Sequence, residues 1–242
     1  MRPTRRRLLW TGLCAALVLV VLGGLTIHGT LWPNRLLAAH YDVRGVDVSH
    51  HQGPIDWEAL AGDDVDFAYI KATEGSSHVD DRFAANWQDA RDAGLVVGAY
   101  HFMSFDSPGE DQARNLVAAV PPTPGMLPPV VDLESYGEYV DHLPDASTVR
   151  PILDDLLAAL EEEYGVPPII YTTGDVFDAY VDGAYDDNPV WIRSVLLPPH
   201  LPGGRDWTFW QYSDRDHRDG IDGGVDMDVF AGTEEEFADL RL

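Results

Sequence analysis

From residue 41 onward, short apolar runs alternate with amphipathic stretches along the chain. Runs of four to eight residues rich in β-branched and aromatic side chains predict strands, whereas apolar positions recurring every three or four residues predict helices. Eight strands are expected, at residues 45–48, 67–71, 96–102, 129–133, 169–172, 190–193, 209–212 and 226–230. Helices are expected at residues 82–93, 109–120, about 147–164, 173 to about 180, and after 233.

The order of these elements predicts the fold class. The first five strands alternate with helices, and loops join the last three. This pattern favours an α/β fold, a TIM-like barrel with five βα units followed by three strands lacking full helices. An open doubly wound sheet is the alternative. No G-x-G-x-x-G follows any strand, which weakens a dinucleotide-binding interpretation of that alternative.

Several helix ends carry recognisable signals. Gly94 and Gly165 stand where a left-handed residue usually closes a helix. Ser147 is a good N-cap for the longest helix of the body. Thr233 and Glu236 have the spacing of a capping box at the start of the last helix.

The N-terminus predicts a targeting segment. Residues 1–7 are basic, and residues 8–27 are uncharged and mostly apolar, a length that suffices to span a bilayer. The arginines before the span predict a cytoplasmic N-terminus and an extracytoplasmic body. No clear cleavage site follows, so an uncleaved signal anchor is favoured over a cleaved signal peptide. We therefore expect a membrane segment at 1–28, a linker at 29–43 and one catalytic domain at 44–242.

The charge of the body excludes one class of partner. The formal net charge of the chain is −25, and the first forty residues hold five arginines and no acid. The remainder therefore has 11 basic against 41 acidic residues. Such a body repels phosphate polymers, so nucleic acid is not expected as a partner. Cys14 is the single cysteine, so the body forms no disulfide and carries no thiolate chemistry.

Acidic residues interrupt the apolar strands near their ends. Asp47 lies within GVDVS, Asp132 and Glu134 close PPVVDLES, and Asp226 and Asp228 lie within GGVDMDVF. An unpaired buried carboxylate is costly, so acids in such runs need a reason. Because the carboxyl ends of barrel strands converge on the active site, these acids are candidates for catalysis. The competing interpretation is that they form ion pairs or cap helices.

The spacing of Asp132 and Glu134 predicts a reaction class. Two residues apart on a strand, they face the same side about 6.6 Å apart along the backbone. Two neighbouring carboxylates raise one pKa, which leaves one group protonated and the other ionised, as glycoside hydrolysis requires. This spacing exceeds the roughly 5–5.5 Å of direct carboxylate nucleophiles, and it suits either an intervening water or an acetamido group of the substrate.

Aromatic residues near the strand ends supply a second indication, because sugar rings stack on aromatic faces. The alternative is that they fill the barrel core. The residues are Tyr100, His101, Phe102, Tyr136, Tyr171, Trp191, Trp210 and Tyr212.

Three other patterns are set aside. Ser49 and the two histidines after it lack the G-x-S-x-G elbow of a serine hydrolase. The acids at 214, 216 and 219 depart from the EF-hand spacing, which favours a solvated loop over a calcium site. Lys71, the single lysine of the chain, is expected to pair with a neighbouring acid such as Glu74. No metal and no cofactor are expected.

Seven segments, in this order, resemble glycoside hydrolase family 25, the Ch-type lysozymes, and they cover residues 44–240. They are GVDVSHHQGPIDW, FAYIKATEG, GLVVGAYHF, PPVVDLES, IIYTTGDVF, FWQYS and VDMDVF. The resemblance implies a barrel of five βα units and three further strands. It also implies a muramidase that hydrolyses the β-1,4 bond between N-acetylmuramic acid and N-acetylglucosamine in peptidoglycan. Net retention is implied, with the substrate's N-acetyl group as internal nucleophile.

The same resemblance assigns roles to residues. Glu134 matches the general acid/base, and Asp132 matches the carboxylate that stabilises the reacting acetamido group. Asp47 and Asp226 match the other acids of the site. Tyr171 matches a tyrosine near the reacting group.

Weaker expectations complete the site. Tyr100, Gln211 and Trp210 are expected to line the cleft. Asp228 departs from the family pattern, where asparagine is expected, and could form a salt bridge. We expect a monomer with a mildly acidic pH optimum. The alternatives are a silent, membrane-tethered glycan-binding module and a glycosidase of different linkage specificity, such as a chitinase.

Overall fold

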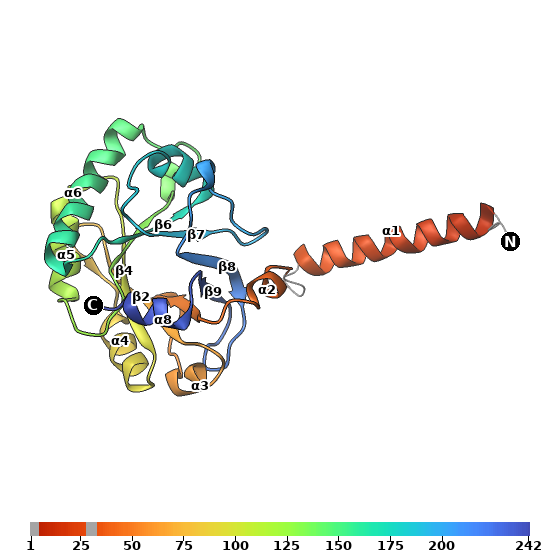
Figure 1. Cartoon of the computed structure of the whole chain (residues 1–242), viewed down its shortest axis with the longest axis horizontal. Helices are drawn as coiled ribbons and strands as arrows, with labels where there is room; N and C mark the ends of the chain where they lie inside the picture. Colours follow the sequence, from red (N-terminus) through yellow and green to blue (C-terminus); the bar gives the residue numbers. More distant parts are fainter. Residues whose placement is uncertain (1–4, 28–32) are drawn as a thin grey trace.

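The computed structural model describes residues 5–27 and 33–242, and it consists of a compact body and one projecting helix (Figure 1). The projecting helix is α1 (Arg5–Ile27), and a short helix, α2 (Pro33–Ala38), lies where the chain meets the body. Residues 1–4 and 28–32, which belong to the expected targeting segment and linker, lie outside the described residues. Across the positions that the structure describes, no helix combines the length and apolar character needed to cross a bilayer.

Eight strands close into a barrel, and all eight expected strands are confirmed. Going around the barrel, the order is β1, β2, β4, β5, β6, β7, β8 and β9, and β9 pairs back with β1. A ninth, two-residue strand, β3 (His78–Val79), pairs with the end of β2 and was not expected. The barrel strands are β1 (Arg44–Val48), β2 (Phe67–Glu74), β4 (Val96–Phe102), β5 (Val130–Leu133), β6 (Ile169–Thr173), β7 (Val190–Arg193), β8 (Phe209–Asp216) and β9 (Val225–Phe230).

One strand runs in the opposite direction to the others. Strands β1 to β8 of the barrel pair in parallel, but β9 is antiparallel to both β8 and β1. The expected barrel of five βα units and three further strands is therefore confirmed, and its last strand is antiparallel to both neighbours. The chain between β8 and β9 is too short for the crossover helix that a parallel pair needs, so a hairpin forms instead.

Helices surround the parallel strands largely as expected. Gly165 closes the longest helix in the left-handed conformation, with φ of 74°. That helix begins at Ala146, so Ser147 lies inside it and is not the N-cap. The capping box of Thr233 is confirmed. The helices are α3 (Trp57–Ala61), α4 (Phe83–Asp92), α5 (Gly109–Ala119), α6 (Ala146–Tyr164), α7 (Gly174–Val176), which continues as a π-turn over Phe177–Val181, and α8 (Glu234–Asp239).

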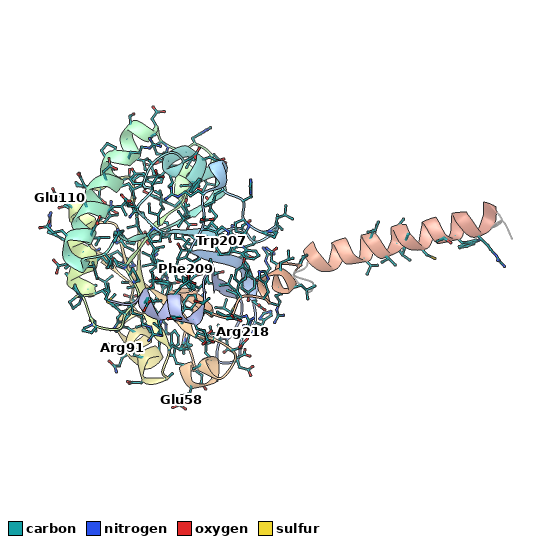
Figure 2. All side chains as sticks on the ribbon, viewed as in Figure 1. Glu58, Arg91, Glu110, Trp207, Phe209 and Arg218 are labelled. Carbon is teal, nitrogen blue, oxygen red and sulfur yellow. The ribbon has the colours of Figure 1, made fainter. Side chains whose placement is uncertain are left out.

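Aromatic side chains fill one end of the barrel. Phe67, Tyr69 and Phe209 are fully buried there, and Phe237 of α8 covers them with its ring 5.4 Å from that of Phe67. Figure 2 shows Phe209 inside the barrel, whereas Glu58 and Glu110 lie at the periphery. Because Phe67 and Phe209 begin their strands, the filled end is the amino end, and the carboxyl end is left for polar residues.

The chain before β1 packs on the outer face of the barrel. The Asn34 side chain is buried and donates hydrogen bonds to the carbonyl oxygens of Ser194, at 2.9 Å, and Tyr212, at 3.3 Å. The Tyr41 ring lies 5.6 Å from Trp207 and 6.3 Å from Trp210. The described part of the expected linker thus covers β8, a strand that no helix follows.

Candidate active site

A cavity of about 340 Å³ opens at the carboxyl ends of the strands. Its lining is dominated by polar side chains, in contrast to the aromatic filling at the other end. The lining residues come from all eight barrel strands and from segments that follow them. They are Asp47, Ser49, His51, Lys71, Tyr100, Phe102, Val130, Asp132, Glu134, Tyr171, Trp191, Arg193, Gln211, Asp214 and Asp226.

Strand pairing brings distant acids together. Asp47 of β1 is the register partner of Asp226 of β9, although 179 residues separate them. Asp132 of β5 is the register partner of Tyr171 of β6. Glu134 follows β5 directly and lines the same cavity. The structure therefore gathers all four expected catalytic acids and the expected tyrosine in one site.

A hydrogen-bonded chain fixes one wall of the cavity. The Tyr171 hydroxyl donates to Gln211 Oε1 at 3.0 Å, and Gln211 Nε2 donates to Asp47 Oδ2 at 2.7 Å. The amide of Gln211 is buried and engages both neighbours, so its orientation is set. Because the Tyr171 hydroxyl hydrogen points toward Gln211, its oxygen lone pairs remain free to accept a hydrogen bond from a substrate.

The two central carboxyl groups lie in surroundings that favour their protonated forms. Asp132 is buried, and its Oδ1 has no hydrogen-bond partner among the described residues. Burial, followed by the negative charges of Glu134 and Asp47, raises the pKa of Asp132 well above its usual value. Burial also raises the pKa of Glu134, against the positive charge of Arg193. Both groups therefore resist ionisation, and an ionised Asp132 requires a hydrogen-bond donor from the substrate.

Asp47 and Asp226, two further acids of the cavity, share this character. Burial raises the pKa of Asp47 to about 6, against hydrogen bonds that include the one from Gln211. Burial and the charge of Asp47 raise the pKa of Asp226 to about 9. Arg193 is the main counter-charge; its guanidinium binds Asp214 at 2.7 Å and faces the cavity beside these acids.

Asp228 is buried beneath the cavity floor. Its Oδ1 accepts a hydrogen bond from Trp191 Nε1 at 2.9 Å, so its partner is an indole and not the cation of the salt bridge considered above. Burial, and then the charges of Asp47 and Asp226, raise its pKa well above the usual range. A protonated carboxyl offers one acceptor and one donor, as the amide of an asparagine would.

Replacing Asp228 by asparagine should therefore stabilise the protein at alkaline pH. The amide keeps the acceptor for Trp191 and removes a buried group that must ionise as pH rises. We expect the Tm at pH 8 to rise by about 4 °C, with little change at pH 5. Thermal unfolding at the two pH values measures this. Asp228→Leu, which removes the acceptor, should lower the Tm at both, and a lower Tm for Asp228→Asn at pH 8 would contradict the assignment.

The acids of the cavity also set how stability depends on pH. A carboxyl group whose pKa is higher in the folded state stabilises the fold while it is protonated, and this contribution is lost as pH rises through the folded value. For Asp226 that window runs from about pH 4 to about pH 9. We expect the Tm to fall across this range. Asp226→Asn should make the decrease in Tm with pH less steep. A Tm that rises steadily to pH 9 would show that hydrogen-bond donors or cations stabilise the ionised acids in the folded protein.

Trp210 lies outside the cavity, so the structure does not bring it to the site. Its ring faces the outer side of β8, where Nε1 donates to the Ser194 carbonyl at 2.9 Å. Successive side chains of a strand point to opposite faces, so Gln211 facing inward forces Trp210 outward. Trp191 fills the inward position on the neighbouring strand instead.

Eight cavity residues were not named as site residues from the sequence. Among them, Trp191 was named only as an aromatic near a strand end, His51 was considered only with Ser49, and Arg193 carried no signal of its own. The pairing of Arg193 with Asp214 joins residues 21 apart and depends on the parallel register of β7 and β8. An arginine at the end of a predicted barrel strand is the feature that could have identified it.

The patterns that were set aside are explained by local structure. Lys71 binds Glu74 at 2.7 Å, which confirms the expected pair. Ser49 caps a 3₁₀ turn, His50–Gln52, by accepting a hydrogen bond from the backbone of His51. Asp214 and Asp216 lie on β8 and pair with arginines. Over the described ranges, no group of three or more potential ligands is arranged to hold a metal ion.

Comparisons with known proteins agree with this architecture. The family model for glycosyl hydrolases family 25 matches residues 46–221. The chain is 37% identical over 205 residues to the protein YegX of Escherichia coli O157:H7, an alignment that covers 83% of this chain and 74% of YegX. It is 35% identical over 202 residues to Lysozyme M1 of Streptomyces globisporus, covering 79% and 68% respectively.

The fold is likewise shared with a solved structure. A family 25 glycosyl hydrolase from Bacillus anthracis matches with a TM-score of 0.80 and 44% identity, covering 82% of this chain and 93% of the other. Its likeness extends to the closed barrel of eight strands described above. Since the family model matches well over half of the chain and these relatives align with most of it, the chain belongs to glycosyl hydrolases family 25 and is a glycoside hydrolase.

Proposed function

We propose that this protein is a muramidase that cleaves the β-1,4 bond between N-acetylmuramic acid and N-acetylglucosamine in peptidoglycan. One observation carries the proposal: Asp132 and Glu134 lie at the end of β5 in a cavity that also holds Asp47, Asp226 and Tyr171. The lysozyme name of the Streptomyces globisporus relative supports the same substrate.

Glu134 acts first as the general acid in this proposal. It gives its proton to the glycosidic oxygen as the bond from that oxygen to the sugar's C1 breaks. The acetamido carbonyl oxygen of the same sugar attacks C1 and forms a cyclic oxazolinium ion. Glu134, now ionised, takes a proton from water, which attacks C1 and reopens the ring. Two displacements at C1 give net retention.

Asp132 stabilises the positive charge that develops on the acetamido group. Its Oδ1 is buried without a partner among the described residues, so it is available to accept the acetamido N–H. That hydrogen bond favours the ionised form of Asp132, and it opposes the rise in pKa that burial causes. In this proposal, substrate binding leaves Asp132 ionised while Glu134 keeps the proton that it donates.

The remaining residues orient the reacting group. Tyr171, whose hydroxyl hydrogen is committed to Gln211, presents lone pairs toward the cavity. Asp47, held by the same amide, supplies negative potential beside the developing cation once it is ionised, and its register partner Asp226 stays protonated below about pH 9. Tyr100 offers a ring face for a sugar at the cavity wall.

The test is digestion of purified peptidoglycan by the full chain, followed by borohydride reduction and mass spectrometry of the products. Reduced muramic acid at the new ends is the expected result. Reduced glucosamine ends would show a different linkage specificity. Absence of any released fragment, with retained binding to the polymer, would replace the muramidase by a glycan-binding module.

The N-terminal segment provides a second part of the proposal: it exports the barrel and keeps it at the outer face of the membrane. The basic residues 1–7, the uncharged and mostly apolar sequence of residues 8–27 and the absence of a clear cleavage site support this. Protease added to intact spheroplasts should degrade the barrel, and the barrel should sediment with membranes. A barrel protected from protease would contradict export, and one found in the medium would show that the segment is cleaved.

A further inference from the structure

Exposed leucines gather on one side of the barrel. Outside α1, six large apolar side chains are more than two-fifths exposed in the described part of the chain. Four of them are leucines from only two segments, α2 and the loop after β7. We call these four the leucine patch: Leu36, Leu37, Leu196 and Leu197, exposed by 83%, 43%, 69% and 71%. Contiguous exposed apolar groups mark interaction sites more often than scattered ones.

The two segments of the patch are fastened to each other. Asn34, at the start of α2, donates to the Ser194 carbonyl, and so does the indole of Trp210. The Ser194 hydroxyl in turn donates to the Leu197 carbonyl at 2.6 Å. The side chain of Asn34 is fully buried. The leucines are therefore presented by an ordered junction, and their exposure is part of the folded structure.

The surroundings of the patch differ in charge from the rest of the body. Residues 28–41 and 194–205 contain no aspartate or glutamate, although the chain has 41 of them. The same two segments contain Arg35, His40, His200 and Arg205. Arg35 is half-exposed and reaches Asp216 at 3.4 Å. The segments that carry the leucines thus hold no acid of their own, on an otherwise acidic body, which favours contact with an anionic lipid surface.

The patch also lies where the chain joins its apolar helix. Helix α1 leaves the body at α2, and the loop after β7 extends toward the same side (Figure 1). Leu17, Leu19 and Val20 of α1 are more than three-fifths exposed. Exposed apolar side chains thus occur on both α1 and α2, the two described helices that precede the barrel.

We propose that the leucine patch contacts the interfacial layer of an anionic phospholipid bilayer and fixes the barrel against it. The inference rests on the proposed export to the outer face of the membrane. It goes further because it assigns a second membrane contact to the folded body. Since Arg193 lines the cavity and directly precedes Ser194, this contact would hold the cavity at a set height and angle above the lipid.

The experiment uses the full chain in vesicles of phosphatidylglycerol and phosphatidylethanolamine. Cys14→Ser removes the native thiol, and a fluorophore is attached to a new cysteine through Leu197→Cys. The matched control is Val140→Cys, at a residue 62% exposed in the η2 turn (Gly137–Val140). Flotation reports binding, and nitroxide-bearing lipids report contact by quenching.

Flotation with strong quenching at 197 and little at 140 is the expected result. In the unlabelled chain, the double variant Leu196→Ser, Leu197→Ser should lower the affinity of the barrel for the vesicle surface by roughly tenfold or more. The reason is that two leucine side chains are no longer transferred from water into the apolar layer. Flotation with equal quenching at both positions would contradict lipid contact by the leucine patch. It would still agree with membrane anchoring by the N-terminal segment. Failure to float would overturn both.

Discussion

Replacing Glu134 by glutamine should lower kcat on peptidoglycan by about three orders of magnitude, since a positioned general acid contributes roughly 10²–10⁴ in rate. The amide matches the carboxyl group in size but cannot deliver a proton to the glycosidic oxygen. Binding to insoluble peptidoglycan should change little. The measurement is the initial rate of soluble product release, set beside a sedimentation assay for binding.

Glu138→Gln is the matched control, because Glu138 lies nearby in the exposed turn after β5 and takes no part in the cavity. It should leave kcat unchanged. Asp132→Asn should also lower kcat, by about two orders of magnitude or more, since a neutral amide stabilises the oxazolinium ion poorly. Full turnover by Glu134→Gln would remove this residue from the mechanism.

Replacing Gly109 by alanine should destabilise the fold by about 3 kcal/mol, at the upper end of typical overpacking costs. Gly109 begins α5, and a Cβ there would lie 2.1 Å from the Ile152 carbonyl oxygen and 2.6 Å from the Leu156 nitrogen of α6. Both atoms belong to helix backbone, so relief requires the two helices to separate. For a body of this size, the Tm should fall by roughly 6–12 °C.

Gly174→Ala provides the control for this prediction. Gly174 is exposed at the start of α7, has no atom within 4 Å of an added Cβ, and keeps an ordinary φ. Its Tm should stay within about 2 °C of the wild type. Equal Tm values for the two variants would show that α5 and α6 are less tightly apposed than described.

Local patterns were sufficient to predict most of the fold. Residues 96–102 and 190–193 form strands with the expected bounds, because apolar runs flanked by Gly, Pro and Asp admit few alternatives. The direction of β9 was not predictable from its own residues, because pairing direction depends on the connection and on its partners. Helix α3 was missed because five residues with two buried side chains give no readable period.

The candidate site was predicted unevenly for a related reason. Acids such as Asp132 stand out because a carboxyl group within an apolar strand is costly. Trp210 and Trp191 look alike in sequence, and only the inward or outward phase of each strand separates them. Strands β7 and β8 are largely buried on both faces. Their sequences therefore do not alternate between apolar and polar residues, and they do not indicate which side chains point into the barrel.

The pairing of β1 with β9 has a consequence for the timing of activity during biosynthesis. Asp47 and Asp226 meet only when the first and last strands of the barrel join, a contact of long sequence separation that forms late and slowly. A growing polypeptide that has not yet released residues 225–230 lacks one edge of the barrel and half of this acid pair. The cavity, with its pair of Asp47 and Asp226, therefore cannot be complete until residues 225–230 have been synthesised and released.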